Sequence, residues 1–254
     1  MKLVVGIDVG TSGTRALVVD ETGKLVSQGA APHSSSRPHP SWSEQDPAEW
    51  WRAACAATRA AIESGRISAG DIAAVGLSGQ MHGLVMLDER YEIIRPAILW
   101  NDQRSVAECG EIERHFGRQK LLEVACNPAL AGFTAPKILW VAKNEPENRK
   151  RVRHVLLPKD YVRYRLTGNF ATDVSDASGM LLMDIRRRDY WPDMLKLLDL
   201  NAAVLPKLYE SPDVTGFITG DAAKATGLAP GTPVVAGAGD QAAAAVGNGI
   251  VAGG

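Results

Sequence analysis

Three apolar stretches joined by short polar turns occupy the first 31 residues, and this arrangement limits the fold more than any other feature. Leu3–Val9 is rich in β-branched residues and predicts a strand buried on both faces. A Gly-Thr-Ser-Gly turn at 10–13 precedes the second stretch, 14–20, and a Glu-Thr-Gly-Lys turn precedes the third, 25–31. Because turns this short join antiparallel strands, we expect a three-stranded meander.

A helix and a further buried strand follow the meander. Asp46 suits the helix N-cap, Pro47 the first helical position and Glu49 a capping box, so we expect a helix to about Ser64. Residues 72–77 (IAAVGL) predict the next buried strand.

The remaining chain adds shorter elements. We expect strands 84–87 and 97–100 to pair, and helices to dominate 105–166 with breaks at the prolines 128, 136, 146 and 158. A last strand at 233–238 precedes a helix that starts at Asp240. The order β-β-β-α-β-α predicts an α/β fold with a mixed sheet, an antiparallel meander plus parallel strands, flanked by helices.

Composition excludes several classes of protein. The 254 residues are 45% hydrophobic and 22% charged with a net charge of −1, which suits one large α/β domain or two small ones and gives no reason to expect nucleic acid. Three cysteines without a CxxC pair suggest free thiols in a reducing compartment. The apolar amino terminus is too short for a signal peptide, and no run approaches the ~20 apolar residues of a membrane span, so we expect a cytoplasmic protein.

The sharpest motif is GIDVGTSGT at residues 6–14. Asp8 ends the first strand, where its carboxylate could hold Mg²⁺ directly or through water. The turn after it lets backbone N–H groups approach phosphate oxygens, and its hydroxyls add donors. It is not a Walker loop, because no Gly-Lys-[Ser/Thr] follows; the alternative is an ordinary glycine-rich hairpin. The candidate phosphate-binding residues are Gly10, Thr11, Ser12, Gly13 and Thr14.

A second strand runs into glycines and an acid at VVAGAGD, residues 234–240. The carboxylate of Asp240 would lie at a strand end, within reach of a substrate hydroxyl. The competing interpretation is a dinucleotide fingerprint, since Gly237, Gly239 and Ala242 match G-x-G-x-x-A. That interpretation needs an acid about twenty positions later, beyond residue 254.

Two more strand ends carry polar side chains. Gln80, Met81 and His82 follow the strand at 72–77 between two glycines, and either bind a ligand or include a structural histidine. Asp102, in WNDQR at 100–104, either clamps substrate hydroxyls or caps a helix. Trp42 could cover a sugar or fix its own loop to the body.

These motifs resemble a known family. GIDVGTSGTRALVVD is similar to the first phosphate motif of the actin-like ATPase and sugar-kinase superfold, and GFTAPKILWVAKN at 132–144 is similar to the signature of the FGGY carbohydrate kinases. SRPHPSWSEQDP, GQMHG, RPAILWNDQR, LLPKDYVRYRLTG and AGAGD resemble the members that phosphorylate D-xylulose. Glycerol-specific members have Arg-Glu where this chain has Met81 and His82.

The resemblance implies a fold, partners and site residues. The fold would be the actin-like ATPase, ribonuclease H-like domain, with ATP and Mg²⁺ as cofactors and D-xylulose as substrate. Asp240 would be the catalytic base and Asp8 with its turn would face the ATP phosphates and the metal. Sugar-binding candidates are Met81, His82, Gln80, Asp102 and Gln241; the last is a departure, since these members commonly have Asn there.

The resemblance also divides the chain. Residues 1–245 would be the sugar-binding domain with the first phosphate loop, and 246–254 the start of a connection to a missing C-terminal domain that grips most of the ATP. The piece alone is therefore expected to be inactive. The oligomeric state is open, with a homodimer as one option.

Three rival functions need separate tests. The first is an FGGY kinase for ribulose, gluconate or another polyol. The second is a non-catalytic sugar sensor or ATP-dependent clamp on the same superfold. The third is a dehydrogenase with a nicotinamide cofactor.

Overall fold

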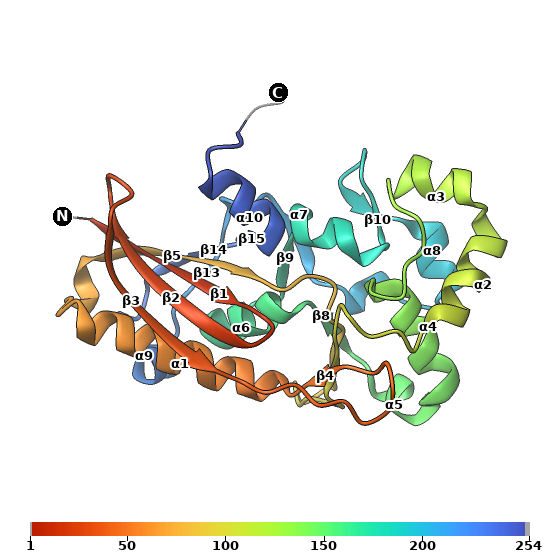
Figure 1. The fold of residues 1–254 in the computed structure, drawn as a ribbon, viewed down its shortest axis with the longest axis horizontal. Helices are drawn as coiled ribbons and strands as arrows, with labels where there is room; N and C mark the ends of the chain where they lie inside the picture. The colour runs from red at the N-terminus through yellow and green to blue at the C-terminus, as the bar shows by residue number, and fades with distance from the viewer. Residues whose placement is uncertain (1, 252–254) are drawn as a thin grey trace.

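A mixed sheet forms one end of the molecule (Figure 1). The computed structural model describes residues 2–251. Within it β1 pairs antiparallel with β2 and parallel with β5, and β15 adds to the end of β5. The meander and the mixed sheet are thus confirmed. The order is β13–β14–β5–β1–β2–β3, with bounds β1 Leu3–Val9, β2 Gly13–Asp20, β3 Leu25–Pro32, β5 Ile72–Gly79, β13 Val214–Phe217, β14 Pro233–Val235 and β15 Ala238–Gly239.

Helices cover one face of this sheet. α1 (Pro47–Ser64), α6 (Pro158–Thr167) and α9 (Gly220–Thr226) pack on one side, whereas α10 (Asp240–Gly247) lies on the other (Figure 1). Asp46 caps α1 as predicted, because its carboxylate accepts a hydrogen bond from the Ala48 N–H at 2.9 Å. Glu49 instead forms an ion pair with Arg52, so the predicted capping box is wrong.

The first strand is buried on one face only, contrary to the sequence-based expectation. Val5 and Ile7 point into the core against α1, whereas Val4 is 41% exposed. Leu17 of β2 is 40% exposed on the same open face. The continuous apolar run therefore did not distinguish a covered face from an uncovered one.

The other end of the molecule is largely helical. Pro136 lies in the first turn of α4 and does not break it, since the first-turn N–H groups have no helical partner to lose. The strands expected at 84–87 and 97–100 do not form a hairpin: β6 pairs with β8, β7 pairs with β4, and one bridge joins Leu84 to Ile98. The helices are α2 Val106–Phe116, α3 Arg118–Val124, α4 Thr134–Asn144, α5 Pro146–Arg151, α7 Val174–Ala177 and α8 Pro192–Leu197. The short strands are β4 Glu44–Gln45, β6 Val85–Leu87, β7 Ala97–Ile98, β8 His154–Leu156, β9 Ala171–Asp173, β10 Met183–Asp184, β11 Asp189–Tyr190 and β12 Lys207–Tyr209.

Two hydrophobic clusters stabilise these two ends. One lies between the sheet and α1 and includes Trp50, which is fully buried. The other joins α2, α4 and α8 and includes Ile112 and Met194. The strand ends that carry the polar motifs lie where the two parts meet. No helix in the part of the chain that the structure describes is long and apolar enough to span a bilayer.

Candidate active site

Asp8 and Asp240 lie at the same edge of the sheet. Asp8 on β1 is the register partner of Ser78 on β5, and Ala238 on β15 is the partner of Ser78 from the other side. Asp240 begins α10 two residues later. Parallel strands bring their carboxyl ends together, and the sheet therefore places a carboxylate on each side of the end of β5.

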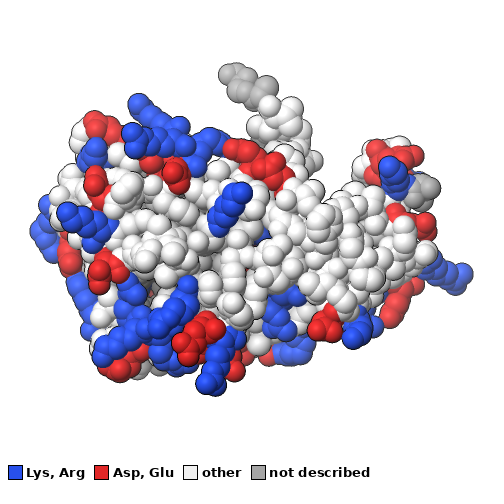
Figure 2. Space-filling model, turned by 180° about the vertical axis from the view of Figure 1, so that it is seen from behind, with Lys and Arg blue, Asp and Glu red and all other residues white. Residues whose placement is uncertain are grey.

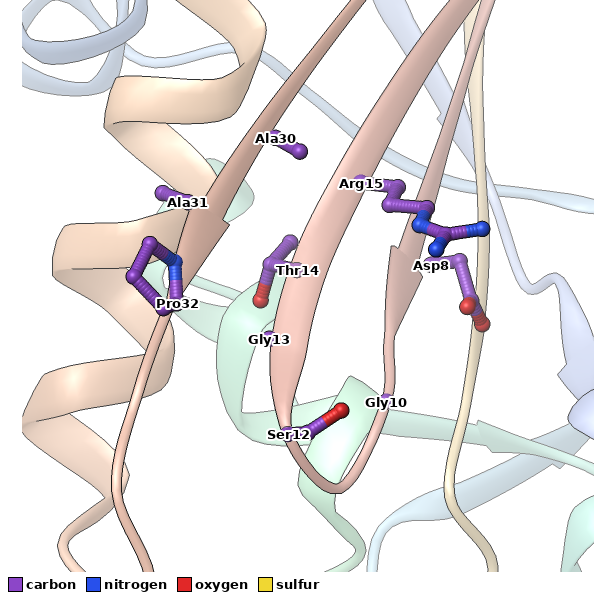
Figure 3. Close-up of a pocket in the computed structure, with 9 residues that line it drawn as sticks. All are labelled: Asp8, Gly10, Ser12, Gly13, Thr14, Arg15, Ala30, Ala31 and Pro32. Atoms are coloured by element: carbon purple, nitrogen blue, oxygen red, sulfur yellow. The ribbon is translucent and has the colours of Figure 1, made fainter.

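The turn after β1 borders an open hollow. A pocket of about 370 Å³ lies beside Asp8 and the turn, with residues 30–32 of β3 on its other side (Figure 3). Ser12 is exposed at the tip of the turn. Position 13 leaves no room for a side chain, because a Cβ on Gly13 would lie 2.9 Å from the Ala31 carbonyl oxygen. The geometry leaves backbone and a hydroxyl open to an anionic group.

Arg15 adds a positive charge to this pocket. It is the cross-strand partner of Asp8, and Figure 3 shows its guanidinium reaching toward that carboxylate from β2. Sequence reasoning passed over Arg15 because it falls within an apolar strand. The alternation of the strand, which buries Ala16 and exposes Arg15, is the signal that would have found it.

The remaining hydroxyls of the turn face inward. Thr11 Oγ1 donates to Gln80 Oε1 at 3.2 Å and accepts from Trp100 Nε1 at 3.0 Å. Thr14 is fully buried. Gln80 is 1% exposed and donates from Nε2 to the Gly10 carbonyl at 3.2 Å. These contacts fasten the turn at 10–14 to the end of β5.

The surroundings of Asp240 change its acidity. Burial, and then the charge of Asp8, raises the pKa of Asp240 above its usual value. The charge of Asp8 acts on Asp240, as expected for two carboxylates at the same edge of the sheet. Gln241 follows on the exposed side of α10.

Met81 and His82 lie against the same strand end. A Cβ on Gly239 would lie 2.9 Å from Met81 Sδ, so the backbone before Asp240 packs directly on Met81. His82 Nδ1 is 2.9 Å from the Gly179 carbonyl oxygen, which requires Nδ1 to carry the proton. Burial and then the charge of Lys137 lower the pKa of His82 to about 4, which leaves the ring neutral at pH 7.

Asp102 is a buried anchor in this structure. Its carboxylate accepts from the Ser43 N–H at 2.6 Å and forms an ion pair with Arg104 at 2.8 Å. The Arg104 guanidinium stacks 3.7 Å from the ring of Trp42, which also packs edge-on against Trp140. Of the two interpretations of Trp42, these contacts support the one in which it fixes its own loop to the body.

Two serines at the site were missed by sequence reasoning. Ser78 Oγ donates to Asp8 Oδ1 at 2.7 Å, and Ser175 Oγ accepts from the Gly239 N–H at 3.2 Å. Ser78 ends the buried strand and could have been found from its position. Ser175 comes from a segment distant in sequence, and only the tertiary structure brings it to the strand end.

The acidic edge fits a magnesium ion carried with phosphate. One carboxylate oxygen of Asp8 accepts a hydrogen bond from Ser78. The repulsion between the carboxylates of Asp8 and Asp240 favours a cation between the two strand ends. Among residues 2–251 no cluster of three or more histidine, cysteine or acidic side chains could hold a metal alone. Such a site suits Mg²⁺, which keeps several waters and takes other ligands from substrate phosphates.

Comparisons with known proteins identify the family of the chain. Residues 3–247 match the model of the N-terminal domain of the FGGY family of carbohydrate kinases. The chain is 45% identical to the xylulose kinase of Escherichia coli (strain K12) over 98% of its length, and 40% identical to that of Bacillus subtilis (strain 168) over all of it. It covers 50% and 51% of those proteins, so it spans about half the length of the curated relatives that it matches.

Solved structures give the same result. The xylulose kinase of Rhodospirillum rubrum aligns with a TM-score of 0.94 at 28% identity, covering 99% of this chain and 51% of that one. A gluconate kinase from Lactobacillus acidophilus aligns with a TM-score of 0.88 at 25% identity, covering 94% and 48%. The match therefore extends to kinases whose names give different sugars.

Proposed function

Because the chain belongs to the FGGY family of carbohydrate kinases, we propose that it is the sugar-binding half of an enzyme that phosphorylates D-xylulose with MgATP. The product is D-xylulose 5-phosphate. The single observation that carries the proposal is the placement of Asp8 and Asp240 on either side of β5 at one edge of the sheet. A base and a phosphate-facing acid must share one crevice for a phosphoryl group to pass between two substrates.

Each acid has a separate role in this proposal. Asp240 orients the terminal hydroxyl of the sugar and takes its proton, and its raised pKa makes it a better base than an ordinary aspartate. Asp8 faces MgATP, whose metal neutralises charge on the transferred phosphoryl group. The turn 10–14 and Arg15 receive the phosphate oxygens. Because the transition state is loose, positioning and charge neutralisation supply most of the rate.

The sugar lies on Met81 and His82. His82 carries its proton on Nδ1, so Nε2 is an acceptor for a sugar hydroxyl, and the ring is neutral at pH 7. A neutral ring favours a neutral ketose over the carboxylate of gluconate, which a cation would hold more strongly. Gln80, Asp102 and Gln241 complete the proposed set, with Gln80 and Asp102 acting through the loops that they hold.

The second half of the protein would close the site. We propose residues 1–245 as the sugar-binding domain and 246–254 as the start of the connection to an ATP-gripping domain; residues 252–254 lie outside those that the structure describes. The relatives' additional length, about as long as this chain, leaves room for a domain of that size. A clamp from both sides would exclude water from the phosphoryl group.

Asp240→Asn in a full-length kinase that carries this chain tests the proposal. The substitution keeps the shape of the side chain and removes the base. We expect kcat to fall at least about 1,000-fold while calorimetry detects D-xylulose binding within about threefold of the unmodified affinity. Turnover near the unmodified rate would refute the assignment of Asp240.

A substrate panel separates the rivals. D-xylulose, D-ribulose, gluconate and glycerol are compared by kcat/KM, and D-xylulose should give the highest value. A clear preference for gluconate or ribulose would move the protein to another specificity in the family. Sugar binding without ADP release by the full-length protein would instead support a sensor.

A further inference from the structure

His82 has a backbone conformation that is unfavourable for a residue with a side chain. Its φ is 67°, and the Gly83 N–H donates to the Met81 carbonyl at 2.8 Å across it. A hydrogen bond from residue i+2 to residue i with positive φ between them is a γ-turn of the rare, strained kind. Such strain costs roughly 1–3 kcal/mol and persists only where neighbouring groups hold it.

Two donors from α4 converge on the peptide that ends this turn. Lys137 Nζ donates to the His82 carbonyl oxygen at 2.9 Å, and Thr134 Oγ1 donates to the same oxygen at 3.1 Å. Lys137 also donates to the Gly132 carbonyl oxygen at 2.7 Å. Both donor side chains are fully buried, so water does not replace them.

The burial of Lys137 needs a reason, because removing an ammonium group from water is costly. The two groups that accept its hydrogen bonds are carbonyl oxygens rather than carboxylates. Burial lowers the pKa of Lys137 to about 7, with the charge of Asp102 opposing this fall and that of Arg104 adding to it. A methionine or leucine would fill the space without that cost, so the contribution specific to Lys137 is the pair of hydrogen bonds that it donates.

We infer that Lys137, assisted by Thr134, is a positioning residue that holds the strained turn at His82 and thereby aims the imidazole at the sugar. The inference rests on the proposed function, in which His82 binds D-xylulose. It gives a physical role to the lysine of the GFTAPKILW signature, which is too deeply buried to meet a ligand itself. Even without its charge, the amine keeps two N–H groups for the two carbonyls.

The test is a double-mutant cycle between Lys137→Met and His82→Asn in the full-length kinase. Asparagine tolerates positive φ, so His82→Asn removes the ring with little added strain. We expect Lys137→Met to raise KM for D-xylulose about 10- to 100-fold while KM for ATP changes less than about twofold. In the His82→Asn background the same substitution should raise the sugar KM less than about twofold further, because the ring that it aims is gone.

Lys143→Met is the matched control. Lys143 lies on the same helix but is 42% exposed and pairs with Glu111, so its replacement should leave both KM values unchanged. If Lys137→Met does not fold, Thr134→Val removes one of the two donors without changing volume and should raise the sugar KM about three- to tenfold.

The outcomes separate the two proposals. An unchanged sugar KM in His82→Asn would overturn the proposed sugar site itself. A raised KM in His82→Asn, with Lys137→Met or its replacement Thr134→Val behaving like Lys143→Met, would overturn only the positioning role. Full additivity of the two substitutions would also overturn it, since that result indicates general loosening of the fold.

Discussion

Asp240, the proposed base, has a raised pKa, and the causes of that rise have a thermodynamic consequence. Its carboxylate is partly buried and lies in the field of Asp8. Each condition disfavours the ionised form in the folded state relative to the unfolded chain. A carboxylate held in this environment lowers the stability of the fold, a cost that is common among active-site residues.

Asp240→Asn should therefore stabilise the protein while it inactivates it. The folded state holds the Asp240 proton more tightly than the unfolded state, so the stability of the unmodified protein falls as pH rises from the ordinary aspartate pKa through the raised one. We expect the variant to melt about 1–2 °C higher at pH 8, a gain of less than about 1 kcal/mol because the group is partly exposed. The gain should vanish near pH 3, where both states of the unmodified protein are protonated. Calorimetric melting at both pH values checks this, and a variant that melts lower at pH 8 would contradict it.

At the scale of secondary-structure elements, α6 supports the loop before Asp240. Arg163 donates to the Ala236 carbonyl oxygen, and Lys159 forms ion pairs with Asp160 and Asp173 at 2.8 Å and with Asp176 at 3.1 Å. All the side chains of these ion pairs are fully buried. Burial raises the pKa of Asp176 to about 7, so below that pH Asp176 is mostly protonated and the two cations balance the other two acids.

This network reaches the loop before Asp240 through the hydroxyl of Ser175. Asp173 caps α7 by accepting from the Ser175 N–H at 2.8 Å and from its hydroxyl at 2.5 Å. The same hydroxyl accepts from the Gly239 N–H at 3.2 Å. Lys159 therefore supports the residue before Asp240 through Asp173 and Ser175.

Lys159→Met should be among the most destabilising substitutions in the chain. It leaves buried carboxylates without their shared cation, which costs about 3–5 kcal/mol in comparable pairs. Urea unfolding measures the loss, and Lys150→Met is the control, since Lys150 is 69% exposed in its pair with Glu147 and should change stability by less than about 0.5 kcal/mol. A loss below about 1 kcal/mol for Lys159→Met would show that the network contributes little.

Some of these elements could be predicted from the sequence and others could not. Local signals were sufficient for β1 to β3, for the N-cap of α1 at Asp46 and for the strand ends that carry Asp8 and Asp240, because turn chemistry and apolar runs act over a few residues. The Lys159 network was not predictable, since LLPKDYVRYRLTG at 156–168 looks like an ordinary charged helix. Its burial depends on carboxylates 14 and 17 residues later in the chain, and a periodic pattern carries no information about such contacts.

At the scale of the whole molecule, one side of the sheet is left open. Val4, Leu17 and Val235 border an apolar hollow of about 370 Å³ on the face opposite α1. On the back of the molecule, Figure 2 shows a stretch of surface right of centre with few charged side chains, whereas side chains of both signs lie around it. The described chain leaves the turn at 10–13 and this face of the sheet uncovered.

The 254-residue chain by itself should accordingly bind sugar weakly and transfer no phosphate. Met81, His82 and Asp240 are already assembled at one strand edge, so some affinity for D-xylulose should remain, whereas the pocket beside Ser12 is open to solvent and cannot exclude water from the transferred group. Calorimetry with D-xylulose is expected to give a dissociation constant on the order of 1 mM or weaker, since each 1.4 kcal/mol of lost contact costs a factor of ten.

ADP release with MgATP and sugar should not exceed that of the same chain carrying Asp240→Asn, which measures contaminating activity. Sugar-dependent ADP release well above that control would mean that these residues complete a working site without a second half.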